Sequence, residues 1–362
     1  MSSSDDPGVT DHLTAAAAVA GSAGGDVADF ERDAALTPVD RIHRFLHGQP
    51  VAGPAIVLVA ATVVFSFLSD TFFASANFSL IVQQVMTIGI LGIGQTIVIL
   101  TAGIDLSVGA IMVLTSVIMG KLAVEQGMPA PLAILIGFAV GALLGWINGT
   151  LVTRVKLPPF IVTLGTWQIF FAINLWYSES ETLRSQDVEQ QASMLQWLGR
   201  SFEAGGTRIT YGTILMLGMF AVFWYVMKWT AWGQHIYAVG DDAESARLSG
   251  IRRDRVLLSA YVVAGVVCAV AGWALIGRTG SVSPQSGQDA NLDSISAVVI
   301  GGTSLFGGRG RIVGTLLGAL TVGVFRSGLV QASVDVLWQN FSVGVLIIVA
   351  VSIDQWIRRV VA

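Results

Sequence analysis

The sequence predicts an all-α membrane protein that crosses the bilayer about ten times, with some helices short or broken. Hydrophobic residues make up 53% of the 362 residues and charged residues only 12%, whereas soluble domains carry about 25% charged residues. From Val51 to Ile353 the chain is mostly apolar segments of membrane-spanning length. The short alternating strands that predict a membrane barrel are not seen.

The predicted spans are apolar runs bounded by polar, glycine or proline residues. In order they are Val51–Leu68, Leu80–Leu100, Leu106–Val124, Leu132–Val152, Phe160–Tyr177, Tyr211–Met227, Val256–Ile276, a weak segment Leu292–Leu305, Ile312–Val330 and Val336–Ile353. A polar loop, Ser178–Arg208, separates the fifth span from the sixth. Residues 50–362 therefore form one predicted transmembrane domain.

Residues 1–49 differ from the rest in being rich in Ser, Gly, Ala and Asp. Such a composition cannot bury a core, so we expect a disordered cytoplasmic tail. The run Ala15–Ala20 is too short for a signal-peptide core and follows acidic residues, so no cleaved signal is predicted.

The distribution of basic residues predicts that both termini are cytoplasmic. With that orientation 14 of the 20 Lys and Arg residues lie inside and Arg326 lies within a span. The five outside are Lys121, Arg184, Arg200, Arg208 and Arg278. The count depends on the weak eighth segment being a true crossing.

Glycines recur at four-residue intervals in two spans, at Gly137, Gly141 and Gly145 and at Gly314 and Gly318. This spacing lets helices approach closely in a membrane, so we predict tight packing there. A faint likeness between ILTAGIDLSVGAIM and VVIGGTSLFGGRGRIVGTLLGAL carries no prediction of its own.

The loop from Trp229 to Val256 is the most charged part of the apolar region. Its stretch Asp241-Asp242-Ala243-Glu244 has the spacing of a capping box, and Gly250 suits the left-handed position that ends a helix. A helix of about two turns, roughly 12 Å long, fits between them. Such a helix could contact a partner protein, or it could be a surface loop that contacts nothing.

Two charged residues near or within spans have more than one interpretation. Asp105 could face an aqueous pathway at a break between spans, or cap the start of the third span. Arg326 lies about four turns into the ninth span. It could belong to a functional site or reach toward the outer interface.

Other polar residues could line a path for a hydroxylated solute, or could join neighbouring helices by hydrogen bonds. Asp289, Asp293, Ser294 and Ser296 flank the weak eighth segment, where a broken helix lining a cavity would explain the low hydrophobicity. The candidate path residues are Gln83, Gln95, Asp105, Ser107, Thr163, Thr166, Asn174, Asp293 and Arg326, with Gln84 and Gln168 as further polar groups within spans.

Several classes of site are absent from the sequence. Cys268 is the single cysteine, and none of the four histidines lies in an apolar run, so neither a disulfide nor a metal site is predicted. There is no phosphate-binding GxxxxGK[ST] loop, HExxH motif or nucleophile elbow. We therefore expect no catalytic residues and no cofactor, and any energy source for uphill transport to lie on another protein.

Four stretches, in this order, resemble the ribose-type sugar permeases of bacterial ABC importers: TAGIDLSVGAIMVLTSVI, LPPFIVTLGTW, YAVGDDAESARLSGI and AVVIGGTSLFGGRGRIVGTLLGAL. Branched-chain amino acid permeases are more distant relatives. The resemblance covers about Val51 to the C-terminus and implies a multi-pass subunit of the inner membrane without ATPase activity. It implies that two copies form the path for a pentose or hexose within the lipid bilayer, with no nucleic acid as partner.

The resemblance also implies a separate ATP-binding cassette subunit and a periplasmic sugar-binding protein. The family's coupling segment corresponds to Gly240, Asp241, Asp242, Glu244, Ser245, Ala246, Arg247, Leu248, Ser249, Gly250 and Ile251. Asp241-Asp242 departs from the usual polar pair there. The alternative function is a channel or ion-coupled carrier that needs no ATPase; it requires an ion site, for which Asp105 and Arg326 are the candidates.

Overall fold

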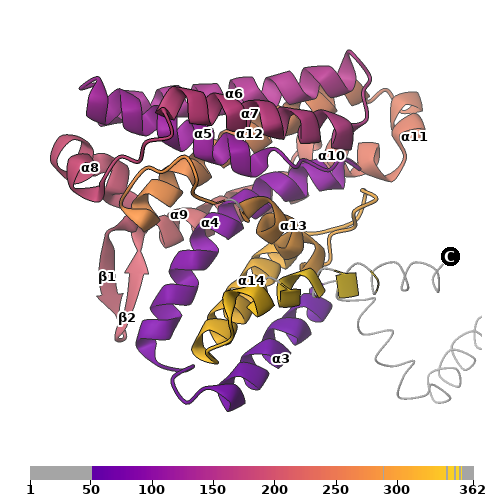
Figure 1. The fold of residues 1–362 in the computed structure, drawn as a ribbon. Helices are drawn as coiled ribbons and strands as arrows, with labels where there is room; N and C mark the ends of the chain where they lie inside the picture. Colours follow the sequence, from indigo (N-terminus) through magenta and orange to yellow (C-terminus); the bar gives the residue numbers. More distant parts are fainter. Residues whose placement is uncertain (1–50, 288, 340, 346–347, 350–351, 353–362) are drawn as a thin grey trace, which may run out of the picture. The chain divides into compact units, whose positions relative to one another are not determined.

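The computed structural model describes residues 51–287, 289–339, 341–345, 348–349 and 352, so the predicted N-terminal tail lies outside the described residues. The helices are α3 (Ala52–Leu68), α4 (Ser75–Leu100), α5 (Val108–Gly120) with a π-helical continuation (Lys121–Glu125), α6 (Ala130–Thr153), α7 (Pro159–Ser178), α8 (Ser185–Ala192), α9 (Tyr211–Trp229), α10 (Ala231–Asp241), α11 (Ala243–Leu248), α12 (Arg253–Thr279), α13 (Ala290–Ile300) and α14 (Ile312–Gln331). This all-α polytopic architecture confirms the predicted fold class (Figure 1).

Within the described residues, seven helices are long and apolar enough to cross a membrane: α4, α5 with its continuation, α6, α7, α9, α12 and α14. Each matches a predicted span. Helix α3 is shorter, with 17 residues. The predicted tenth span, Val336–Ile353, lies partly outside the described residues and stays a prediction.

Helix α12 packs against α4, α5 and α6, while α14 packs against α3, α4 and α13. The predicted tight packing is confirmed at the α6–α12 contact, because a Cβ atom on Gly141 would collide with the carbonyl oxygen of Gly265. On α14, a Cβ on Gly318 would likewise collide with the carbonyl oxygen of Ala297 in α13. Small residues therefore set how closely these helices approach.

The structure corrects the predicted bounds of the eighth span. Instead of Leu292–Leu305, the helix is Ala290–Ile300, with 11 residues. Its length of about 16 Å is well below the roughly 30 Å of the hydrocarbon core. Irregular segments precede and follow it, as the broken-helix interpretation expected.

The loop Ser178–Arg208, predicted only as polar, folds into three elements. These are α8, a 3-10 helix (Ser193–Gly199) and an antiparallel hairpin of β1 (Ser201–Ala204) and β2 (Thr207–Thr210). Val188, Leu195 and Leu198 are fully buried, and this burial orders the segment. Gly205 and Gly206 both have positive φ, +58° and +79°, as a two-residue hairpin turn requires.

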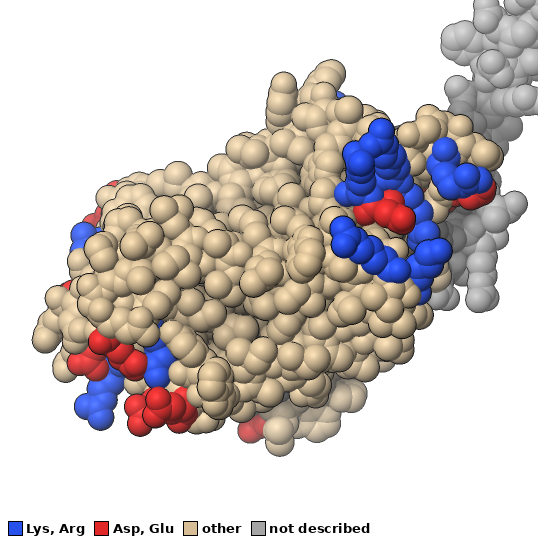
Figure 2. Space-filling view, turned by 90° about the horizontal axis from the view of Figure 1, so that it is seen from above, with Lys and Arg blue, Asp and Glu red and all other residues tan. Residues whose placement is uncertain are grey.

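Charged side chains gather at the two ends of the face shown in Figure 2, and the band between them is largely uncharged. We call one end the basic end; it carries Arg154, Lys156, Arg252, Arg253 and Arg255 at the ends of α6 and α12 and also includes α10 and α11. The other, the hairpin end, carries α8 and the hairpin. An uncharged band between charged ends is what a bilayer requires.

Helices α4 and α13 end in the same way at the basic end. The Gly103 N–H donates to the Val98 carbonyl (3.2 Å), and the Thr303 N–H donates to the Val298 carbonyl (3.1 Å). The residues before them, Ala102 and Gly302, have φ of +61° and +79°. The faint sequence likeness between these regions therefore corresponds to a shared helix-ending motif.

Candidate coupling segment and transport path

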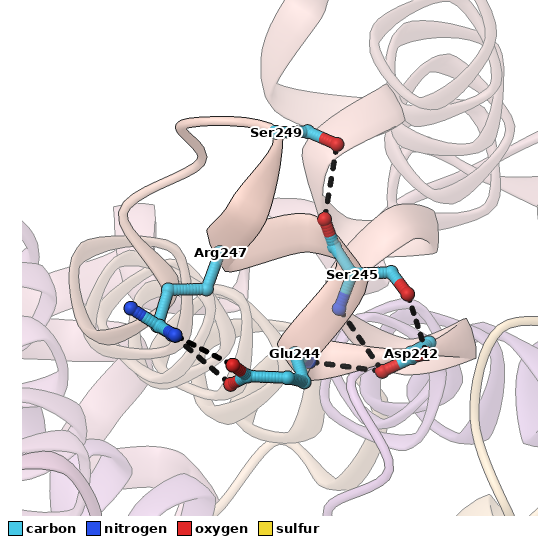
Figure 3. A network of polar contacts seen from close by, with 5 residues as sticks. All are labelled: Asp242, Glu244, Ser245, Arg247 and Ser249. Carbon is cyan, nitrogen blue, oxygen red and sulfur yellow. Dashed lines mark hydrogen bonds and ion pairs between the residues drawn. The ribbon is translucent and has the colours of Figure 1, made fainter.

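The predicted coupling segment forms the end of α10, helix α11 and the turn after it. Asp242 caps α11, because its Oδ1 accepts from the backbone N–H groups of Glu244 (2.9 Å) and Ser245 (3.2 Å). The Ser245 hydroxyl also donates to Asp242 Oδ2 (2.6 Å; Figure 3). These hydrogen bonds, the Ser245 hydroxyl first, lower the pKa of Asp242.

The cap corrects the predicted capping box. That interpretation places the cap at Asp241 with Glu244 reaching back to it, whereas the cap is Asp242. Glu244 instead pairs with Arg247, whose Nε donates to Glu244 Oε2 (3.0 Å; Figure 3). The pairing lowers the pKa of Glu244 and raises that of Arg247. Helix α11 has six residues, about 9 Å, and is shorter than predicted.

The end of α11 follows the prediction. Gly250 has φ of +85°. Its N–H donates to the Arg247 carbonyl and the Ile251 N–H donates to the Ala246 carbonyl, both at 3.0 Å. This pair of hydrogen bonds is the Schellman motif.

The segment divides into residues that hold it to the bundle and residues that face outward. Ala246 is buried, and Ile251 packs against the same hydrophobic core. A Cβ on Gly240 would collide with the Leu100 carbonyl at the end of α4. The exposed members are Asp241, Asp242, Glu244, Ser245, Arg247, Leu248, Ser249 and Gly250.

Leu248 is the exposed apolar residue of this segment, with 74% of its surface accessible. Glu244, Arg247 and Leu248 are three and four residues apart and so share one face of α11. That face combines an apolar tip with an ion pair at the basic end.

A cavity of about 530 Å³ lies behind the segment at the basic end. Its lining includes Gly103, Lys156, Gly240, Ala243 and Tyr261. The ends of α4, α6 and α10 and the start of α12 therefore border one space, and any displacement of α10 and α11 changes its walls.

Two of the candidate path residues lie together toward the hairpin end. Arg326 Nη2 donates to Asp293 Oδ1 at 2.7 Å and lies 3.8 Å from Asp289 Oδ2. These residues border a cavity of about 300 Å³ that also includes Gln84, Thr87 and Arg278. Arg278, predicted to lie outside the membrane, is in the last turn of α12.

A neighbouring cavity of about 450 Å³ shares Gly287 and Asp289 with this one. It contains the predicted residue Asn174 and the in-span Gln168, together with Trp167 and Asn291. Trp167 and Asn291 are not among the path residues predicted from the sequence. The signal for Asn291 is its place between Asp289 and Asp293, in a segment already predicted to be broken.

Asp105 and Ser107 lie in a separate buried network. Asp105 Oδ1 accepts from the Ser107 N–H (2.8 Å) and hydroxyl (2.6 Å), and Asn148 Nδ2 donates to the Ser107 hydroxyl (2.8 Å). The third span begins at Val108, after Ser107. Asp105 is therefore not its N-cap but holds the turn before it.

The remaining candidates are dispersed. Thr163 donates to the Ile104 carbonyl (2.9 Å), and Thr166 donates to the Thr163 carbonyl (3.4 Å). Gln95 is fully buried, and neither its Nε2 nor its Oε1 has a hydrogen-bond partner among the described residues. Gln83 is half-buried on α4. These four border neither of the two cavities toward the hairpin end.

Comparison with known proteins identifies the family. Residues 77–351 match the family described as the permease component of the branched-chain amino acid transport system. The chain belongs to this family. It is 54% identical over 338 residues to a fructose import permease protein of Rhizobium meliloti, covering 93% of this chain and 94% of the relative.

More distant relatives include two ribose import permease proteins. The one from Bacillus subtilis is 38% identical over 84% of this chain and 92% of its own length, and the one from Escherichia coli is 34% identical over 83% and 92%. No solved structure matches this chain.

Family membership explains the architecture. The chain is a transport permease and not an enzyme, and it is a multi-pass protein of the inner membrane. ATP-binding and solute-binding components of such a transport system are separate proteins.

Proposed function

We propose that this chain is the permease of an ATP-driven importer and carries a monosaccharide across the inner membrane. The observation that carries the proposal is that α11 has one face held to the bundle and another that points outward. Helix α10, which leads into α11, lies against α4 through Gly240, and α11 itself is held to the core through Ala246, yet it presents Leu248, Glu244 and Arg247 outward. A short helix with these two faces suits the transfer of motion from a docked ATPase to the spans.

Docking at α11 would couple ATP binding to the cavities. Leu248 would insert into a groove on the ATPase, and Glu244 and Arg247 would make polar contacts at its rim. Because α10 and α11 border the cavity at the basic end, their displacement would open or close it. The solute would then have access alternately from either side.

The path would follow the broken eighth segment. Asp293 and Arg326 border one of the two neighbouring cavities there and Asn174 borders the other, and the Asp105–Ser107–Asn148 network lies nearer the basic end. In this proposal the basic end faces the cytoplasm, as the distribution of Lys and Arg predicts.

A second copy of the chain, rather than lipid, would cover one face of α7. Gln168 lies at the middle of this span, borders the 450 Å³ cavity and is also exposed at the outer face of the helix. An amide facing hydrocarbon at this depth is costly. A homodimer with its path beside α7 would remove that cost, and lipid would contact the outward faces of α6 and α9.

The names of the relatives support a monosaccharide, and fructose is the first sugar to test because the fructose permease is the more similar of those compared. The carrier alternative has less support, because Arg326 is paired with Asp293 and Asp105 is held by Ser107.

Sugar uptake by a Leu248→Asp variant tests the proposal. A carboxylate at a docking position that becomes buried should cost several kcal/mol, so we expect fructose uptake and co-purification of the ATPase to be lost. The measurement is labelled fructose uptake into cells that carry the permease, its ATPase and its binding protein.

Val155→Asp is the matched control. Val155 is an exposed apolar residue (56%) at the same end, in the turn between α6 and α7. It should leave uptake unchanged. Undiminished uptake by Leu248→Asp, or uptake by the wild type without any ATPase, contradicts the proposal and favours the carrier.

A further inference from the structure

The 450 Å³ cavity beside α7 has the chemistry of a binding site for a small uncharged solute. It lies within the range of volumes that ligand sites have, and it combines aromatic walls with a few polar groups. Trp167 and Phe171 of α7 form the aromatic part, and Gln168, Asn174 and Asn291 supply amides. Among the described residues that border it, Asp289 alone is charged.

Asn174 presents an acceptor that the protein itself does not satisfy. Its Nδ2 donates to the Pro284 carbonyl at 2.8 Å, which fixes the orientation of the amide. Its Oδ1 is buried without a hydrogen-bond partner among the described residues, and only 1% of the residue surface is accessible. A buried acceptor without a donor is costly, and a ligand hydroxyl would remove that cost.

Asn291 presents the complementary group. Its Oδ1 accepts from the backbone N–H of Gly109 at 2.6 Å, which leaves the Nδ2 group to donate. It is the second residue of α13, so the N-terminal end of this short helix borders the cavity. The cavity therefore offers an acceptor from α7 and a donor from α13. A sugar hydroxyl can both donate and accept.

The charges argue against an amino acid as the occupant. A zwitterion needs a cation for its carboxylate and an anion for its ammonium group. The described residues that border this cavity include no cation; Arg278 and Arg326 border the adjoining cavity, where Arg326 is already paired with Asp293 at 2.7 Å. A neutral polyhydroxylated ring, with an apolar face for Trp167 and hydroxyls for the amides, fits the lining.

We propose that this cavity is a monosaccharide-binding subsite within the permease, with Asn174 accepting a sugar hydroxyl and Trp167 packing against the ring. This inference rests on the proposed function and adds that the path itself selects the sugar after its delivery. The ion pair Asp293–Arg326 borders the neighbouring cavity and lies outside the subsite.

The test uses proteoliposomes with the permease, its ATPase and saturating fructose-loaded binding protein, so that the binding protein's own preference does not enter. Asn174→Leu and Trp167→Ala should each lower fructose transported per ATP hydrolysed about tenfold, as expected for one lost hydrogen bond or ring contact. ATP hydrolysis stimulated by the binding protein should stay within about twofold of wild type.

Trp176→Ala is the matched control, because Trp176 lies on the same helix and its side chain is exposed. It should transport like wild type. Monodeoxy analogues of fructose give a second readout. The analogue that lacks the hydroxyl facing Asn174 should lose about tenfold in wild type and lose nothing more in Asn174→Leu.

Wild-type transport by Asn174→Leu and Trp167→Ala would overturn the subsite, as would an equal loss in Trp176→Ala. If Asn174→Leu fails to reach the membrane, Trp167→Ala decides. A wild-type protein that imports no monosaccharide, but imports a branched-chain amino acid, would overturn the proposed function itself. The two failures are therefore distinguishable.

Discussion

At the scale of single residues, the ion pair between Arg326 and Asp293 joins α14 to α13 within the bundle. Asp293 is buried, and the Arg326 side chain is only 27% accessible. Removing one partner of a buried pair leaves the other charge uncompensated, which costs about 3 kcal/mol or more. Removing both partners avoids most of that cost.

We therefore expect Arg326→Gln to lower the melting temperature of the purified protein in detergent, and the double variant Arg326→Gln/Asp293→Asn to recover part of the loss. A double-mutant cycle by thermal unfolding measures the coupling. Arg208→Gln is the control, because its pair with Glu203 (3.7 Å) is solvent-exposed and contributes little. Strictly additive losses in the cycle would show that the two charges do not depend on each other.

At the scale of elements, the approach of α6 to α12 decides how the bundle packs. Gly141 and Gly265 face each other so closely that neither accepts a Cβ. Gly218 of α9, by contrast, has no atom within 4 Å of the position of a Cβ. A substitution by alanine would therefore collide with backbone atoms at Gly141 but find free space at Gly218.

We expect Gly141→Ala to destabilise the protein by about 1–3 kcal/mol through overpacking. Gly218→Ala should leave stability unchanged or raise it by up to about 1 kcal/mol, because alanine favours the helix. Thermal unfolding in detergent measures both. Equal stability of the two variants would contradict the close α6–α12 contact.

At the scale of the whole molecule, orientation in the membrane determines which partner each end can meet. The proposed function requires α11 in the cytoplasm and the hairpin outside. Cys268, the single cysteine of the chain, is buried. A cysteine introduced at the surface can therefore be labelled with little labelling of the native Cys268.

Ser201→Cys, in the hairpin, should react with a membrane-impermeant maleimide in intact spheroplasts. Ser249→Cys, after α11, should react only when the membrane is permeabilised. Both serines are exposed, and the change is nearly isosteric. Labelling of Ser249→Cys from outside would reverse the orientation and exclude α11 as the site of an inner ATPase.

Much of the fold was predictable from the sequence, because a membrane span must satisfy its backbone hydrogen bonds within itself. Helix α14 begins at the predicted Ile312, and α9 begins at the predicted Tyr211. The sequence predicted helix ends and loop structure less accurately where several neighbouring polar residues could serve as the cap. The cap of α11 is Asp242 and not Asp241, and the loop Ser178–Arg208 is ordered by buried apolar residues that a polar composition concealed.

The sequence by itself determined the class, the seven long spans, the position of α11 and the polar residues available for a path. Only the tertiary structure decided which of those residues meet. Asp293 pairs with Arg326, 33 residues away, and Asn174 bonds to Pro284, 110 residues away, whereas Thr163, Thr166 and Gln95 lie elsewhere. Helix formation depends on local hydrogen bonds, which the sequence of one segment determines. These contacts between distant residues depend instead on how α7, α13 and α14 pack. The spacing of residues along one helix does not specify which helices lie beside it.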